Sequence, residues 1–247
     1  MIHPRQRVYY IIVRTLPLLL LAATTFAADL PNGGAIDTIA QKEGRGYRHE
    51  FDIRRDAKPH RVLLVGDSIL NGHQKQTREL LAEKANVDVW IYPHSVAPDK
   101  VCDVFKGQIE NQKPYRPYDI VFLHQCIVDW KDPRVTPDTI GPMMKEYVKS
   151  IRARLPKARL IWASATPITE QHLPRELNAK INPIIIERNR IVAKVMEEMD
   201  VEVVDLYGLL VEKTHLAYGN MTHWKAPAYD LISQKVAETI LKEKSGN

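Results

Sequence analysis

Residues 61–68 read RVLLVGDS, and the change from apolar to small and polar residues inside this stretch decides the fold. Residues 61–65 form a short apolar run of strand length, which predicts a buried strand. Gly66 follows, and a glycine allows the chain to turn sharply off a sheet. Asp67 and Ser68 come next, and both residue types are common at helix N-caps. The stretch therefore predicts a strand, a tight turn and the start of a helical region.

The same alternation of apolar runs and amphipathic segments continues to the end of the chain. Strands are expected at residues 61–65, 87–92, 119–124, 158–164 and 201–205, and helices near residues 74–85, 100–110, 137–155, 183–199 and 227–242. Short apolar strands between amphipathic helices indicate an α/β fold with a five-stranded parallel sheet covered on both faces. Right-handed crossovers bring the carboxyl ends of the strands to one edge, where ligands bind. The long connection at residues 167–182 should overhang that edge.

The first 28 residues differ in composition from the rest of the chain. They contain a basic start with three arginines and no acidic residue, then the apolar run TLPLLLLAATTF (residues 15–26), then Ala27 and Ala28. This is the layout of a secretory signal peptide, and an uncleaved N-terminal anchor is the alternative. The apolar run is shorter than the about 20 residues that span a membrane. We therefore expect a signal peptide over residues 1–27, a lead-in over 28–60, one domain over 61–247, and a secreted or periplasmic protein without a stable membrane span.

The 247 residues carry 35 basic and 30 acidic side chains, a formal net charge of +5. Removal of the three arginines would leave 32 basic and 30 acidic residues, so the net charge would fall to +2. We see no basic face with interleaved aromatic residues, and expect no nucleic-acid partner. Cys102 and Cys126 could pair in an oxidising compartment, but the sequence does not fix their separation.

Ser68 is the first candidate for catalysis. It follows a predicted strand at the start of a helical region, where backbone N–H groups face a developing anion. The alternative is that residues 66–68 are a plain strand-to-helix cap.

His223 is the second candidate. The loop GNMTHW (residues 219–224) precedes the last predicted helix, which packs back beside the sheet. A histidine there could reach the first strand, although an isolated loop histidine is more often a surface residue.

Together, VLLVGDS at residues 62–68 and NMTHW at residues 220–224 resemble the SGNH/GDSL hydrolases over most of the chain from residue 61. The resemblance implies a flavodoxin-like, three-layer sandwich and the cleavage of esters, often acyl groups on carbohydrates or lipids. It also implies that Ser68 is the nucleophile, His223 the general base and Asn220 the counterpart of the family's aspartate. Asn189 falls in a helix where such sequences often carry asparagine.

The chain departs from the family pattern at the residues that stabilise the oxyanion. Residues 92–98 (YPHSVAP) lack the family's glycine, and Val128 stands where the family has an asparagine. Asn220 can accept a hydrogen bond from the histidine ring but brings no charge to stabilise an imidazolium. These departures leave open a binding protein of the same fold that has lost catalysis.

Four histidines fall where the functional edge is expected: His73, His94, His124 and His223. Three interpretations of this group remain open. Asp67, His94, His124, Gln125 and Asp129 could include substitute oxyanion donors or substrate-binding groups. The histidines could hold a metal ion, because imidazole suits zinc, copper, iron and nickel. They could also form a polar rim with no joint role.

We adopt the serine-hydrolase interpretation. The expected substrate is a small-molecule ester, or an acyl ester on a carbohydrate, and no cofactor or metal is expected because no compact ligand spacing is present.

Overall fold

The computed structural model describes residues 38–43, 47–52, 58–91, 117–124, 131–173 and 176–242. The chain divides into two units, Met1–Gly33 and Gly34–Asn247, and all described residues belong to the second unit. Among the described residues, no helix has both the length and the apolar composition needed to cross a membrane.

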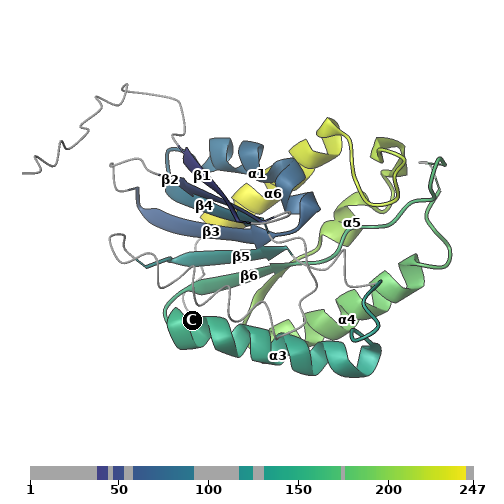
Figure 1. Ribbon diagram of the computed structural model, residues 1–247, viewed down its shortest axis with the longest axis horizontal. Helices are drawn as coiled ribbons and strands as arrows, with labels where there is room; N and C mark the ends of the chain where they lie inside the picture. Colours follow the sequence, from purple (N-terminus) through teal and green to yellow (C-terminus); the bar gives the residue numbers. More distant parts are fainter. Residues whose placement is uncertain are drawn as a thin grey trace, which may run out of the picture. The chain divides into compact units, whose positions relative to one another are not determined.

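The described part of the second unit is built on a seven-stranded sheet with the order β1-β2-β4-β3-β5-β6-β7 (Figure 1). Five strands run parallel to one another: β3 (His60–Gly66), β4 (Ala85–Ile91), β5 (Ile120–His124), β6 (Arg159–Ala163) and β7 (Glu202–Val204). The order β4-β3-β5-β6-β7 is that of a flavodoxin-like sheet, in which the strand order reverses at β3 and β5. The prediction of a flavodoxin-like α/β fold with five parallel strands is confirmed.

Two further strands come from the segment at residues 28–60 that was expected to be a lead-in. β1 (Thr38–Glu43) pairs with β2 (Tyr47–Asp52), and β2 pairs with β4, both in antiparallel orientation. Neither strand was predicted from the sequence. The reason lies in the sequences TIAQKE and YRHEFD, which are too polar to give the continuous apolar run of a buried parallel strand.

Helices cover both faces of the sheet (Figure 1). The long helices are α1 (Ser68–Leu81), α3 (Pro137–Arg154), α4 (Asn182–Glu198) and α6 (Ala226–Leu241), and two short ones, α5 (Leu206–Leu210) and η2 (Thr214–Leu216), follow β7. The expected bounds of α3, α4 and α6 are correct to within one residue. The first helix begins at Ser68 rather than near residue 74, because Asp67 caps it. The helix expected near residues 100–110 lies outside the described part of the chain.

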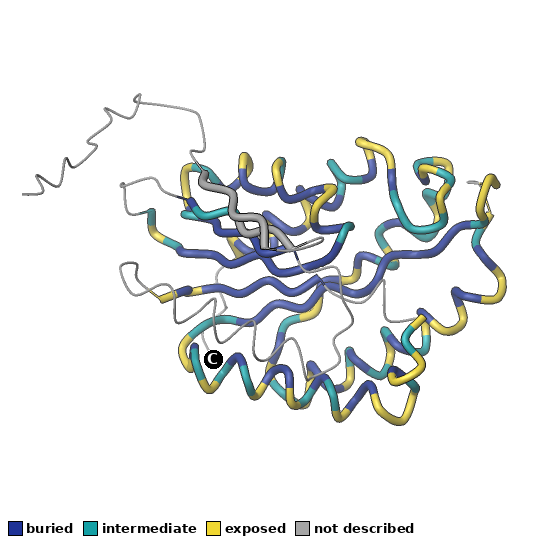
Figure 2. Tube along the Cα trace, viewed as in Figure 1, coloured by how far each residue is buried: buried dark blue, intermediate teal, exposed yellow. Residues whose placement is uncertain are grey.

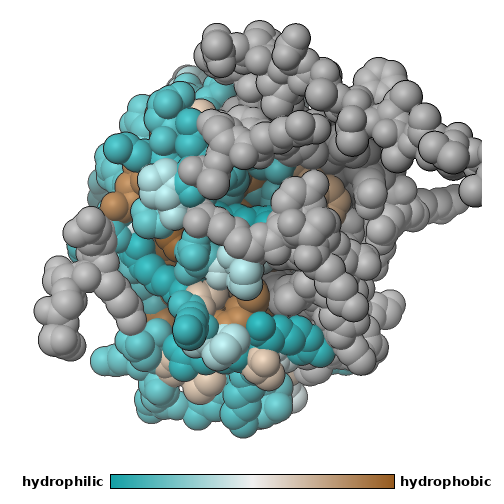
Figure 3. All heavy atoms as spheres, turned by 90° about the vertical axis from the view of Figure 1, so that its left-hand side faces the viewer, coloured by the Kyte–Doolittle hydropathy of each residue, from teal (hydrophilic) through white to brown (hydrophobic). Residues whose placement is uncertain are grey.

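Successive residues of each central strand pack into opposite cores. Figure 2 shows these strands as buried along their length. Val62 and Leu64 of β3 belong to a core shared with α1 and α6, whereas Leu63 and Val65 belong to a core shared with α3 and α4. This alternation follows from the two-residue period of a strand. Figure 3 views the left-hand side of Figure 1, where the coloured residues are mostly hydrophilic with separate small hydrophobic areas. The two apolar cores, one on each face of the sheet, hold the three layers together.

Candidate active site

Gly66 makes the turn from β3 to α1 possible. A Cβ atom at this position would lie 2.6 Å from the carbonyl oxygen of His124 and 2.7 Å from Cβ of Leu70. Because the contact is with the backbone of β5, a Cβ atom at position 66 would require that strand to move. The close approach of β5 therefore requires a glycine here. The turn places the start of α1 at the carboxyl end of β3, beside the end of β5.

Asp67 is buried and caps α1. Its Oδ1 accepts a hydrogen bond from the backbone N–H of Ile69 at 2.9 Å, and its own N–H donates to the carbonyl of His124 at 3.4 Å. Asp67 was predicted as a candidate for substrate binding. Its contacts show that it fixes the start of α1. Ser68 is then the first residue of α1, and its N–H belongs to the first helical turn, where backbone donors have no intrahelical acceptor.

The His223 side chain reaches Ser68 from the loop before α6. Its Nε2 lies 3.0 Å from Ser68 Oγ, although the two residues are 155 positions apart in the sequence. Both side chains are half-buried. Partial burial lowers the pKa of His223 below its usual 6.5, because desolvation disfavours the imidazolium. At neutral pH the ring is therefore largely uncharged and able to accept a proton from Ser68.

The other nitrogen of the His223 ring, Nδ1, lies 3.3 Å from Thr222 Oγ1. The side chain of Asn220 does not take that position: its Oδ1 accepts from the backbone N–H of His223 at 3.0 Å. Asn220 thus stabilises the turn that carries the histidine, and Thr222 is the described hydrogen-bond partner of Nδ1. Thr222 was not a sequence candidate, because hydroxyl residues beside a histidine are too common to be a signal.

The connection after β6 supports the His223 loop. Thr169 N–H donates to the carbonyl of Met221 at 3.0 Å, and His172 N–H donates to that of Gly219 at 3.2 Å. Met221 has a φ of 75°, a left-handed conformation that is uncommon for a residue with a side chain and costs of order 1–3 kcal/mol. The contacts from the connection hold this loop in the conformation that presents His223 to Ser68.

Two asparagines of α4 hold the connection in turn. Asn189 Oδ1 accepts from Ala165 N–H at 2.9 Å and its Nδ2 donates to Ala165 O at 3.0 Å. Asn182 forms the same pair of bonds with Ile168, at 3.1 and 2.5 Å. Each side-chain amide thereby satisfies one backbone donor and one acceptor in a loop. Asn189 was noted in the sequence because related sequences often carry asparagine in this helix, and the two bonds to Ala165 are what it does in the structure. Asn182 was not noted in the sequence.

A contact between α1 and α6 also fixes the histidine relative to the serine. The ring of Tyr229 in α6 packs on Gly72 of α1, where an added Cβ would lie 2.2 Å from Tyr229 Cζ. The Tyr229 hydroxyl accepts a hydrogen bond from Trp224 N–H at 3.4 Å. Trp224 follows His223 directly, so the contact joins the two segments that carry the Ser68–His223 pair.

His73 and His124 form a separate buried pair. Thr77 donates its one hydroxyl proton to the carbonyl of His73 at 3.0 Å, so its oxygen accepts from His73 Nδ1–H at 3.0 Å. His73 Nε2 is then the acceptor facing His124 Nδ1 at 3.4 Å. Burial lowers the pKa of His124 to about 4 and that of His73 well below 6.5. Both rings are therefore neutral at pH 7.

Three of the four histidines, His73, His124 and His223, lie in the described part of the chain, and these three do not form one group. His73 contacts His124, and His223 contacts Ser68. Within the described ranges, no three His, Cys, Asp or Glu side chains are arranged as metal ligands. Four positions named in the sequence analysis, His94, Gln125, Val128 and Asp129, lie outside the described residues, as do both cysteines.

The comparisons with known proteins fit this geometry. Residues 64–231 match the model of the GDSL-like Lipase/Acylhydrolase family, which covers more than half of the chain and includes Ser68 and His223. The chain therefore belongs to this family. The sequence-based predictions of the family and of an ester hydrolase are confirmed. No curated protein matches the sequence significantly.

Several solved structures share the fold. An acetylxylan esterase from Geobacillus stearothermophilus is 14% identical, with a TM-score of 0.59 over 78% of this chain and 100% of its own. The lipase/acylhydrolase from Enterococcus faecalis is 17% identical, with a TM-score of 0.57 over 76% of this chain and 100% of its own. An acetyl xylan esterase is 12% identical, with a TM-score of 0.56 over 73% of this chain and 100% of its own. At these identities the likeness concerns the fold.

Proposed function

We propose that this chain is an exported serine esterase that cleaves an acyl ester, on a carbohydrate or another small molecule, through an acyl-enzyme intermediate. The observation that carries the proposal is the 3.0 Å contact between Ser68 Oγ and His223 Nε2, at the carboxyl edge of the sheet. A serine hydroxyl is a weak nucleophile until an adjacent base removes its proton. An uncharged histidine within hydrogen-bond distance is such a base.

The reaction follows from the positions of these atoms. His223 Nε2 takes the proton of Ser68 as Oγ bonds to the ester carbonyl carbon, and the carbonyl oxygen becomes negative. The Ser68 N–H, in the first turn of α1, is a donor for that oxygen. The imidazolium then protonates the departing alcohol as the ester bond breaks. Water, deprotonated by the same histidine, releases the acid and restores Ser68.

Support for a carbohydrate ester and for export is of a different kind. Acetylxylan esterases are among the solved structures with this fold. The basic and apolar start of the sequence has the layout of a signal peptide. Since fold alone does not specify the substrate, both remain parts of the proposal.

One observation favours the alternative of a binding protein with weak or no catalysis. No carboxylate among the described residues lies against His223 Nδ1, whose described partner is the Thr222 hydroxyl. In Ser-His-Asp enzymes the carboxylate stabilises the imidazolium formed during catalysis. The two functions differ in whether ester hydrolysis depends on Ser68.

The test is a panel of 4-nitrophenyl esters of increasing acyl length, together with acetylated xylo-oligosaccharides. We expect Ser68→Ala to reduce kcat by about 10⁴-fold or more while the protein remains folded, because the nucleophile is lost. Ser150→Ala is the matched control, since Ser150 donates to the carbonyl of Tyr147 in α3 and lies outside the proposed site. A serine-directed fluorophosphonate should label Ser68. Equal hydrolysis by wild type and Ser68→Ala would refute the nucleophile assignment.

A further inference from the structure

The two most exposed of the large apolar side chains in the described ranges lie on the segments beside His223. Tyr218 is 68% exposed and Leu173 is 57% exposed, whereas the others in these ranges are 50% exposed or less. Single exposed apolar residues are common on protein surfaces, so the place of these two matters more than their exposure. Their place next to the proposed site gives that site an apolar surface open to a ligand.

The backbone around His223 places the Tyr218 side chain on the same side as the histidine. Two short extended segments pair here: Tyr218 N–H donates to the carbonyl of His223 at 2.9 Å, and Ala217 lies opposite Trp224. Ala217 and Trp224 are buried in the core shared with α1 and α6. Because successive residues of an extended segment point to opposite sides, Tyr218 and His223 point away from that core. Opposite residues of such a pair have Cβ atoms about 4.5–5.5 Å apart, so the two side chains start side by side.

Leu173 comes from the connection between β6 and α4, which contacts the same loop. His172 N–H donates a hydrogen bond to the carbonyl of Gly219 at 3.2 Å. Leu173 follows His172 and Tyr218 precedes Gly219, so the two exposed side chains come from adjacent stretches of backbone. The apolar surface beside His223 is therefore built from two segments that hydrogen bonds hold together.

The proposed reaction assigns this side of the site to the alcohol part of the ester. His223 Nε2 takes the proton of Ser68 Oγ, 3.0 Å away, and then gives it to the oxygen of the departing alcohol. That oxygen must lie within hydrogen-bond distance of the histidine, about 2.6–3.2 Å. The groups attached to it therefore extend from the His223 ring, next to which Tyr218 lies.

We propose that Tyr218, with Leu173 beside it, binds the alcohol part of the ester and favours an alcohol with a ring that presents an apolar face. A pyranose has such a face, formed by its C–H groups, and so does a hydrocarbon ring. The tyrosine ring offers a large, rigid apolar area to either of them. This inference rests on the proposed esterase function, and it makes Tyr218 a residue that determines specificity.

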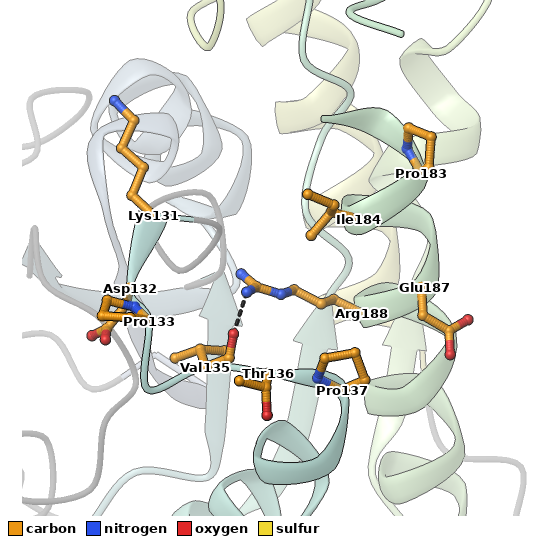
Figure 4. A pocket seen from close by; sticks show the side chains of 10 residues that line it. All are labelled: Lys131, Asp132, Pro133, Val135, Thr136, Pro137, Pro183, Ile184, Glu187 and Arg188. Atoms are coloured by element: carbon orange, nitrogen blue, oxygen red, sulfur yellow. Dashed lines mark hydrogen bonds between the residues drawn. The ribbon is translucent and has the colours of Figure 1, made fainter. Parts of the chain in front are cut away.

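A pocket of about 530 Å³ between the start of α3 and the first turns of α4 is an alternative apolar surface for such a ring (Figure 4). Ile184, which is 42% exposed, lies on its wall. Arg188 crosses the pocket and donates a hydrogen bond to the carbonyl of Val135. A ring bound there would be sensitive to the substitution of Ile184 and insensitive to that of Tyr218, so variants distinguish the two positions.

Four esters test which part of the substrate meets Tyr218. Ethyl acetate is the reference, cyclohexylmethyl acetate adds a ring to the alcohol, and ethyl cyclohexylacetate adds the same ring to the acyl group. An acetylated methyl xyloside supplies a pyranose alcohol. We expect kcat/KM of wild type to rise above that of ethyl acetate by roughly 3- to 10-fold when the ring is in the alcohol, the effect of one aromatic contact. A ring in the acyl group should give no such gain.

The variants are compared by the ratio of kcat/KM for each ring alcohol to that for ethyl acetate. Tyr218→Ala should remove the gain, Tyr218→Phe should keep it because the ring remains, and Leu173→Ala should reduce it. All three keep the backbone hydrogen bonds of their segments. Leu80→Ala, at an exposed position near the end of α1 distant from Ser68, and Ile184→Ala are the controls and should keep the ratio. The ring alcohol that loses more in Tyr218→Ala shows whether the subsite takes a pyranose or a hydrocarbon ring.

Binding of the product alcohols separates this inference from the proposed function, because it needs no turnover. Dissociation constants of cyclohexylmethanol and methyl xyloside, measured by saturation-transfer NMR, should rise in Tyr218→Ala and stay unchanged in Ile184→Ala. That result supports the subsite even if no ester is hydrolysed. Ester hydrolysis with a ratio that is the same in Tyr218→Ala and wild type, or a gain that is lost in Ile184→Ala instead, would overturn the role of Tyr218 and leave the esterase function intact.

Discussion

At the scale of single residues, Asn220 distinguishes this site from a Ser-His-Asp triad. Its Oδ1 accepts from the backbone N–H of His223, so the amide is used to shape the turn. Partial burial lowers the pKa of His223, and the ring titrates below its usual 6.5. A base must be unprotonated to act, so we expect the acidic limb of kcat/KM to have its midpoint below pH 6.5.

Asn220→Asp should shift that midpoint upward. The carboxylate can keep the backbone hydrogen bond and adds a negative charge near the ring, which favours the imidazolium. We also expect kcat to rise, by at most about 10⁴-fold, the contribution of the carboxylate in Ser-His-Asp enzymes. Asn86→Asp is a control, because the Oδ1 of Asn86 accepts a hydrogen bond from the backbone N–H of Lys58 at the start of β4, the end of the strand opposite to the site. A pH–rate profile that is the same in Asn220→Asp and wild type would show that position 220 acts on the turn alone.

At the scale of elements, the packing of α1 on α6 helps to set the distance between Ser68 and His223, the proposed nucleophile and base. Gly72→Ala would place a methyl group 2.2 Å from Tyr229 Cζ, so the ring of Tyr229 or one of the two helices would have to shift. We expect a loss of about 1–3 kcal/mol in the free energy of unfolding, as in other overpacked sites, and a lower kcat. Chemical denaturation and steady-state kinetics measure the two effects.

Gly141 in α3 offers the comparison. A Cβ there would make only ordinary contacts, at 3.6 and 3.7 Å from Ile191 and Val195. Gly141 precedes Pro142, and a Cβ before a proline disfavours the helical conformation, which offsets the advantage of alanine over glycine in a helix. Gly141→Ala should therefore change the free energy of unfolding by less than about 1 kcal/mol. If Gly72→Ala were as stable and as active as Gly141→Ala, the close packing of Tyr229 on α1 would not position the proposed Ser68–His223 pair.

At the scale of the whole molecule, the buried pair His73–His124 links stability to pH. Both pKa values are depressed, so the folded protein resists protonation that the unfolded chain accepts below pH 6.5. Unfolding is therefore favoured progressively as the pH falls from 6.5 to about 4, where His124 titrates in the folded state. With 1.36 kcal/mol per pH unit, His124 alone should lower the free energy of unfolding by about 3 kcal/mol over this window.

Urea denaturation of wild type and His124→Gln between pH 7 and pH 4 tests this effect. Glutamine can still donate a hydrogen bond to His73 Nε2 but does not titrate, so the loss of stability should be smaller in the variant. His215→Gln, at an exposed position, controls for the removal of a histidine. Parallel pH dependences in wild type and His124→Gln would contradict the prediction.

The sequence by itself determined the parallel core of this protein and indicated Ser68 and His223, the two residues that we propose to react. Apolar runs mark the parallel strands, of which β3 to β6 are buried on both faces. RVLLVGDS also contains the local reason for the position of Ser68, since Gly66 permits the turn and Asp67 caps the helix. Export was predicted from the same kind of local pattern and stays a prediction.

Only the tertiary structure decided which distant groups meet. β1 and β2 were not predicted, because strands at and next to the sheet edge can be polar and then lack the continuous apolar run of a buried strand. The roles of Thr222, Asn182 and Tyr229 depend on contacts between segments far apart in the chain, and no spacing in the sequence encodes such contacts. Arg188 shows the same limit: its residue type is ordinary for a helix, and its buried position facing Val135 follows from the packing of α4 against the start of α3. Helices, strands and caps depend on residues that are close in the sequence, as in the cap by Asp67. The contacts of the site join residues that are far apart in the sequence and meet only in the folded chain.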